Sequence, residues 1–231
     1  MSARWVVNDQ SGLQKLNERQ PQAYPGAIRL AAHFFSFIFH PLFIPVYVIV
    51  FISYLQPYAF SGIITNTIFF VIARSVLIYT FFPAVTVLLL KGLGFINSIF
   101  LRSQKERIVP FMACIIWYFW AWHVNRNLSD TLPALVSFSL AVFLTACFGL
   151  LANIYMKVSM HALAAGVMSC FVLFFSFSES INLSLYLSVC LLIAGIVCTS
   201  RLLVSDHTPK EIYAGFLLGV LAQGIALLVA P

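Results

Sequence analysis

Long apolar runs separated by short polar connections fill the chain from about residue 30 to its end. The runs cover residues 30–56, 63–90, 110–125, 133–155, 162–178, 183–204 and 209–230. Most of them are close to the length of about 20 residues that an α-helix needs to cross a bilayer. The pattern predicts an all-α protein, a polytopic transmembrane helical bundle with six to seven spans. A polar N-terminal arm, residues 1–28, would precede a single transmembrane helical domain, residues 29–231.

Three of the runs depart from a uniform apolar helix. The run 110–125 is short and rich in tryptophan, which prefers the membrane interface, so this run is expected to lie shallow or to tilt. The second run carries Arg74 near its middle, and an arginine inside a membrane should face the bundle interior. Contact with a phosphate and a structural hydrogen-bonding role both remain open for Arg74. The first run contains His33 and His40, which we interpret as packing or interfacial residues because no acid or cysteine lies near them in sequence.

Composition supports a membrane protein. Of the 231 residues, 61% are hydrophobic and 9% are charged, compared with about 25% charged residues in soluble domains. The mean hydropathy is +0.97. The net charge of +6 is explained by loop lysines and arginines that face the cytoplasm, so nucleic acid is not an expected partner. The first apolar run is too long for a cleaved signal peptide.

Metal and cofactor binding are not expected. All five cysteines lie in apolar runs without metal-ligand spacing, so we interpret them as small buried hydrophobic residues. The seven acidic residues are dispersed along the chain and form no carboxylate cluster that would hold a cation.

Three polar connections, residues 102–107, 157–161 and 200–211, stand out between the apolar runs. If each run crosses the membrane once, all of these are even-numbered connections and emerge on the same face. The sequence therefore predicts that they meet in one composite site at a membrane surface.

The connection 200–211 has the densest charge and predicts a helix start. Thr208 is the expected N-cap, Pro209 suits the first helical position, and Glu211 lies three residues after the cap. His207 then lies at a helix N-terminus, where the backbone favours an anion. One helical turn would bring the Glu211 carboxylate to the His207 ring, where it can fix the tautomer and raise the basicity of the ring.

The order Ser-Arg at 200–201, five residues, His207, three residues and an acid resembles the third signature of the type 2 phosphatidic acid phosphatase (PAP2) superfamily of membrane lipid phosphatases. That family has an aspartate at the position of Glu211. The segment 158–161, Val-Ser-Met-His, resembles the second signature, Pro-Ser-Gly-His, at Ser159 and His161.

The first signature of that family, a lysine, six residues, an arginine and a proline, is degenerate in this chain. Aligned on Pro110, the chain has Arg102 at the lysine and a valine at the arginine, although Lys105 and Arg107 lie close by. Either the site has shifted, with Arg107 in the role of the arginine, or these residues are only charges on the cytosolic face.

The resemblance implies a metal-independent reaction through a phosphohistidine intermediate. His207 would attack phosphorus, Glu211 would orient its ring, and His161 would protonate the leaving oxygen and then activate water. Five residues would bind the phosphate: Arg201, Ser159, Arg107, Lys105 and Arg102. The substrate would be an amphipathic lipid phosphate from the membrane, either a phosphatidic acid-like lipid or an isoprenyl phosphate or diphosphate.

Two other functions remain open from the sequence. The altered first and second signatures also fit a non-catalytic lipid-binding or scaffold protein of the same fold. Arg74 and the prolines of the first run also fit a transporter or channel. We expect a bacterial inner-membrane protein. The positive-inside rule places the amino end and the three polar connections in the cytoplasm. Many PAP2 relatives, in contrast, act on the outer face of the membrane. Neither the lipid substrate nor the oligomeric state follows from the sequence.

Overall fold

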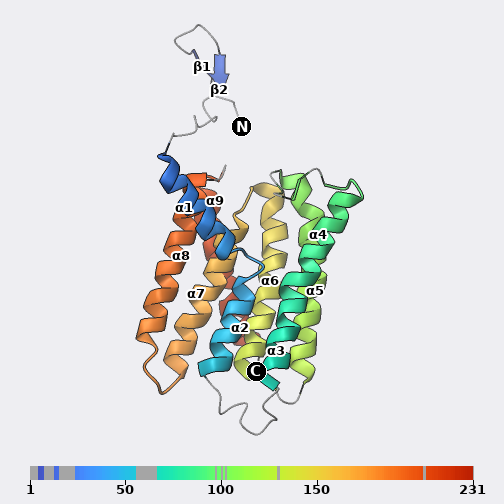
Figure 1. Ribbon diagram of the computed structural model, residues 1–231, viewed down its shortest axis with the longest axis vertical. Coiled ribbons are helices and arrows are strands. Elements are labelled where there is room, and N and C mark those ends of the chain that lie inside the picture. The colour runs from blue at the N-terminus through green and yellow to red at the C-terminus, as the bar shows by residue number, and fades with distance from the viewer. Residues whose placement is uncertain are drawn as a thin grey trace.

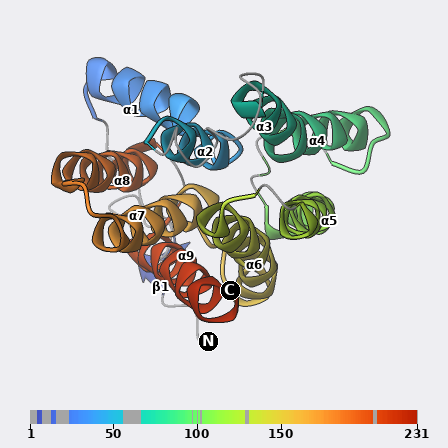
Figure 2. The ribbon, with the colours of Figure 1, turned by 90° about the horizontal axis from the view of Figure 1, so that it is seen from below.

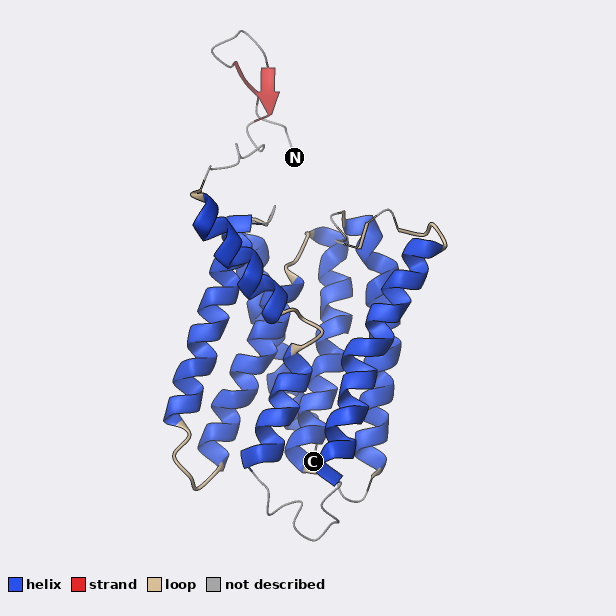
Figure 3. Ribbon diagram, viewed as in Figure 1, coloured by secondary structure: helices blue, strands red, loops and turns tan. Residues whose placement is uncertain are grey.

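The computed structural model describes residues 5–7, 13–15, 24–55, 67–96, 98–99, 101, 103–128, 131–204 and 207–230. The helices in these ranges are α1 (Gly26–Ile38), α2 (Ile44–Leu55), α3 (Thr67–Ser75), the π-helix η2 (Val76–Phe81), α4 (Phe82–Gly92), α5 (Gln104–Asn127), α6 (Pro133–Tyr155), α7 (Met160–Ser178), α8 (Ser184–Val204) and α9 (Pro209–Val229). Two short strands, β1 (Trp5–Val7) and β2 (Leu13–Lys15), pair antiparallel in the N-terminal arm (Figure 3).

The described residues include six helical segments that are long and apolar enough to cross a membrane. These segments are Ile68–Gly92, Gln104–Asn127, Pro133–Tyr155, Met160–Ser178, Ser184–Val204 and Pro209–Val229. The first of them joins α3, η2 and α4 into one continuous rod. The chain is therefore an integral membrane protein, and the predicted helical bundle is confirmed (Figure 1).

The first apolar run forms two short helices instead of one long one. Helices α1 and α2 contain 13 and 12 residues, and the non-helical residues 39–43 form a break between the two helices. Pro41 causes the break because it has no backbone N–H to donate and because its ring drives the preceding residue, His40, away from helical angles. The break lies beside the start of α7, where His40 and Ser36 contact His161.

The third apolar run forms a longer helix than its apolar residues 110–125 suggest, while its depth and tilt in the membrane stay predictions. Helix α5 has 24 residues and is a full candidate span. It starts at a capping box: Glu106 N–H donates to Ser103 Oγ at 3.3 Å, and Ser103 N–H donates to Glu106 Oε2 at 3.3 Å. The cap places the polar residues 104–107 inside the first turn of the helix, ahead of the apolar residues.

Helices α7 and α9 lie side by side and cross in direct backbone contact (Figure 2). A Cβ atom at Gly166 would overlap the carbonyl oxygen of Phe216, and one at Gly219 would overlap the carbonyl oxygen of Leu163. Small residues at a crossing allow this close approach, which gains van der Waals contact inside the membrane. The crossing fixes the start of α7 beside the start of α9.

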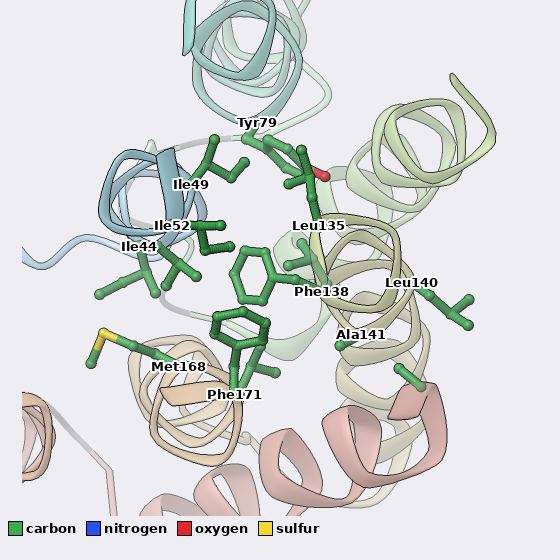
Figure 4. Close-up of a cluster of buried hydrophobic side chains, with 14 of the residues drawn as sticks. Ile44, Ile49, Ile52, Tyr79, Leu135, Phe138, Leu140, Ala141, Met168 and Phe171 are labelled. Carbon is green, nitrogen blue, oxygen red and sulfur yellow. The ribbon is translucent and has the colours of Figure 1, made fainter. Parts of the chain in front are cut away.

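An apolar core fills the space between α2, η2, α6 and α7 (Figure 4). Phe138 of α6 is fully buried and packs on Phe171 of α7, with ring centroids 5.0 Å apart. Ile52 of α2 and Tyr79 of η2 close this cluster from the opposite side. The break between α1 and α2 is thereby anchored to the central helices.

All three polar connections lie at the end of the bundle where the chain enters α1, and the C-terminus lies at the other end (Figure 1). Helices α5, α7 and α9 begin at that end, while α6 and α8 finish there. The predicted arrangement of the three connections on one face is therefore confirmed for the described residues.

Candidate functional site

His207 lies directly before α9 and is only 5% exposed. Its Nδ1 lies 3.3 Å from Glu211 Oε2, the same oxygen that accepts from Thr208 N–H at 2.8 Å. Glu211 N–H in turn donates to Thr208 Oγ1 at 3.3 Å, which completes the predicted capping box. Because a carboxylate accepts, the His207 proton belongs on Nδ1, and Nε2 of the neutral ring keeps its lone pair.

Burial and nearby positive charge keep His207 neutral at physiological pH. Burial lowers the pKa of His207 most, the charges of Arg107 and Arg201 lower it further, and Glu211 opposes them, so that the pKa falls to about 4. A neutral imidazole with a free lone pair, held among arginines, is the form that can attack an electrophilic centre.

Arg107 is buried at the start of α5 and links two of the polar connections. Its Nε–H donates to the Leu101 carbonyl oxygen at 2.8 Å, and an Nη1–H donates to the Val158 carbonyl oxygen at 2.8 Å. These bonds hold the guanidinium group where its charge acts on His207. This position is compatible with the shifted interpretation of the first signature, and the role of Arg107 in binding phosphate stays a prediction.

Helix phase separates Arg107 from the other cations of the first connection. Lys105 lies two residues earlier on α5, which is about 200° around the helix, and its side chain is exposed. Arg102 lies outside the described residues. Of the three predicted cations, the structure places Arg107 in the site and Lys105 on the surface.

Ser159 and His161 lie beside the start of α9, as the predicted composite site requires. Ser159 is fully buried and caps α7, where its Oγ accepts from Ala162 N–H at 3.4 Å. Its own backbone N–H donates to the Glu211 carbonyl oxygen at 3.3 Å, which joins the second connection to the third. The Ser159 hydroxyl is thus engaged in capping.

His161 makes a hydrogen bond that no sequence pattern indicates. Its Nε2 lies 3.0 Å from the Ser36 carbonyl oxygen of α1, and since a carbonyl only accepts, the ring carries its proton on Nε2. The charge of Arg201 acts on this ring. His161 therefore lies between the α9 start and the α1–α2 break.

Arg201, in the last turn of α8, is the electrostatic centre of the site. Its charge acts on His40, His161, Arg107 and His207, which come from four different parts of the chain. Concentrated positive charge around neutral imidazoles is suited to a phosphate group, whose charge must be neutralised before a nucleophile approaches.

Sequence reasoning missed His40 as a member of this cluster. The ring centroids of His40 and His161 lie 5.4 Å apart at an interplanar angle of 80°. His33, the other histidine of the first run, is exposed on α1. The one available signal was Pro41, which follows His40 and interrupts the helix, so that His40 lies in the break between α1 and α2.

Arg74 does not contribute to this site. Its Nη2–H donates to Asn125 Oδ1 at 2.9 Å, and Asn125 Nδ2–H donates to Ser139 Oγ at 2.6 Å. Asn125 lies 18 residues beyond Arg107 on α5, about 27 Å along the helix axis. Arg74 lines an open pocket of about 480 Å³ formed by α3, η2, α4 and α5, and none of His40, His161 and His207 lines this pocket. Its structural hydrogen-bonding role is the one that the geometry supports.

The described residues contain no group of three or more His, Cys, Asp or Glu residues placed to hold a metal ion. The five cysteines are free thiols in helices and are buried or half-buried.

Comparison with known families agrees with this geometry. Residues 152–230 match the model of the PAP2 superfamily, a range that contains the second and third signature segments and about a third of the chain. Searches of curated proteins and of solved structures returned no match. Helices α7, α8 and α9, with the end of α6 and the connection that precedes α7, therefore form a PAP2 superfamily domain.

Proposed function

We propose that this membrane protein is a metal-independent phosphatase that hydrolyses a lipid phosphate or an isoprenyl phosphate or diphosphate through a phosphohistidine intermediate. The observation that carries the proposal is the pair of buried His207 and half-buried Glu211, with Arg107 and Arg201 acting on the same ring. The pair supplies a neutral, oriented nucleophile, and the arginines supply charge for the phosphate.

In the first step, His207 Nε2 forms a bond to phosphorus while the bond from phosphorus to the lipid oxygen breaks. The Nδ1–H of His207 stays bonded to Glu211, whose charge stabilises the ring as it becomes cationic. Arg107 and Arg201 neutralise the phosphoryl oxygens.

His161 supplies the proton that the leaving lipid oxygen needs. Its Nε2–H is bonded to Ser36, so the proton leaves from Nδ1 of the doubly protonated ring. The negative charge of a bound phosphate favours that second proton. In the second step, water attacks phosphorus, its proton passes to His161 Nδ1, the bond from phosphorus to His207 breaks, and phosphate is released.

The position of the site supports a substrate drawn from the bilayer. His207 lies at the end of the bundle, while helices on all sides are apolar enough to contact lipid. An amphipathic phosphate fits this arrangement, with its head at the histidines and its tail between helices. Lys91, Lys157 and Lys210 lie at or beside helix ends on the side of the bundle that carries the site, and Arg126 lies in the last turn of α5 at the other side, so we propose that the site faces the cytoplasm.

A non-catalytic lipid phosphate-binding protein is the second candidate function. The Ser159 hydroxyl caps α7 and the Nε2–H of His161 binds a backbone carbonyl, so both groups are engaged without a ligand. Such a protein would bind lipid phosphates and release no phosphate from them.

Phosphate release separates the two functions. The purified protein is assayed against phosphatidic acid and isoprenyl phosphates and diphosphates, beside His207→Ala and the control His33→Ala, which alters an exposed histidine. We expect His207→Ala to lower kcat at least about 10³-fold, because it removes the nucleophile, and His33→Ala to retain wild-type activity. Full activity of His207→Ala in a folded protein would refute the phosphohistidine route.

A further inference from the structure

The break between α1 and α2 is held in place by side chains from three other segments. The Ser36 carbonyl oxygen accepts from His161 Nε2, the Ile38 carbonyl oxygen accepts from Tyr47 Oη at 2.9 Å, and the Leu42 carbonyl oxygen accepts from Thr80 Oγ1 at 2.8 Å. A helix break leaves such carbonyl groups without helical partners, and here side chains satisfy them. These hydrogen bonds hold the α1–α2 break in place as one wall of the site, which we define as residues 36–42.

His40 lies in this wall with a defined proton position. Leu42 N–H donates to His40 Nδ1 at 3.3 Å, so the neutral ring accepts at Nδ1 and carries its proton on Nε2. The Nε2–H is the donor that the ring can offer to another molecule.

The surroundings of His40 are cationic. Arg201 is the charged group that acts on His40, and the same guanidinium acts on His161 and His207. In the described part of the chain, no ion pair joins a carboxylate to His40 or His161, whereas Glu211 pairs with His207. A wall that presents an N–H donor beside an arginine is matched to an anion.

We propose that His40 is a further substrate-contacting residue, which donates its Nε2–H to an oxygen of the phosphate group that His207 attacks. The proposal rests on the proposed function and extends it, because His40 lies outside residues 152–230. The complete site then consists of the PAP2 domain, Arg107 of α5 and the α1–α2 break.

The geometry favours contact with substrate over a purely structural role. His40 and His161 meet edge to face at 5.4 Å, and the two rings share Arg201 as their charged neighbour. A phosphoryl group presents acceptor oxygens in several directions, so a group bound to Arg201 can accept from His40 while His207 approaches phosphorus from another side. A neutral ring is sufficient for this donation.

Two variants of His40 separate the donor from the ring. His40→Phe keeps an aromatic group beside His161 and removes the donor, whereas His40→Gln restores a donor without an aromatic ring. We expect His40→Phe to lower kcat/KM roughly 10- to 100-fold, the loss expected for one hydrogen bond to a charged group, and His40→Gln to recover part of it. His33→Phe is the matched control and should retain wild-type kcat/KM.

Inorganic phosphate provides a second readout that does not need turnover. Phosphate should raise the Tm of the wild-type protein and of His33→Phe, and it should raise the Tm of His40→Phe much less. Wild-type kcat/KM in His40→Phe, or an undiminished Tm shift with phosphate, would overturn the inference while leaving the role of His207 intact. If no lipid phosphate is hydrolysed, the proposed function fails, and the Tm shift alone decides whether His40 binds phosphate.

Discussion

Acidification should weaken both the fold and the activity through His207. An unperturbed histidine has a pKa near 6.5, and His207 in the folded protein has a pKa of about 4. Between these values the unfolded chain binds one more proton at this position than the folded protein does. The contribution of the neutral His207 ring to the free energy of unfolding is therefore fully present above pH 6.5 and is lost as the pH falls toward 4.

The size of the effect follows from the same two values. Each pH unit between them corresponds to about 1.4 kcal/mol, so His207 should contribute about 3 kcal/mol that is lost by pH 4. At 5% exposure, the ring is shielded from the solvent that would otherwise weaken the effect. The nucleophile must also be neutral, so the acid limb of kcat/KM should have its midpoint near pH 4 instead of 6.5.

The assay compares wild-type protein with His207→Asn in detergent from pH 4 to pH 8. The difference between their free energies of unfolding isolates His207 from the carboxylates that titrate in the same range. That difference should change by about 1.4 kcal/mol per pH unit below pH 6.5. A difference that does not depend on pH, or an acid limb of kcat/KM at 6.5, would refute a buried neutral His207 among arginines.

Two further predictions test the pieces that hold His207. Glu211→Gln keeps the length of the side chain and removes its charge, whereas Glu211→Asp keeps the charge but withdraws it by about 1.5 Å. Both variants should lower kcat roughly 10- to 1,000-fold with little change in KM. Wild-type kcat in both would contradict the orienting role of the carboxylate. Gly219→Ala should lower the free energy of unfolding by about 1–3 kcal/mol because its Cβ would overlap α7, whereas Gly224→Ala, which meets no atom within 4 Å, should stabilise α9 slightly; equal thermal shifts for the two variants would argue against the tight crossing.

Local sequence signals were sufficient to predict the structure of the third connection. The cap at Thr208, the proline after it and the spacing of His207 and Glu211 all act within one helical turn, and the structure contains each of them. The number of spans was predictable for the same reason, because hydropathy is a property of consecutive residues.

The contribution of α1 and of the α1–α2 break to the site could not be predicted from local sequence signals. His161 binds Ser36 through a backbone carbonyl 125 residues away, and a carbonyl group is present at every position of the chain. His40 has no acid or cysteine near it in sequence, and its neighbours His161 and Arg201 reach it only after the bundle has formed.

Helix phase explains the outcome at the first connection. The sequence placed Lys105 and Arg107 in a loop, where both would be free to turn toward the same ligand. The capping box at Ser103 puts them into the first turn of α5 instead, and residues two positions apart on a helix face different directions. One buried arginine and one exposed lysine follow from that start.

The backbone contact between α7 and α9 limits how a lipid phosphate, the proposed substrate, could reach the histidines. With Gly166 and Gly219 pressed against the partner helix, these two helices leave no room for an acyl or isoprenyl chain to slide between them. Helix α8 lies on the other side of α7, next to α1 (Figure 2). If the substrate is a lipid phosphate, as we propose, its hydrocarbon tail would therefore have to leave the histidines by a route other than the α7–α9 crossing.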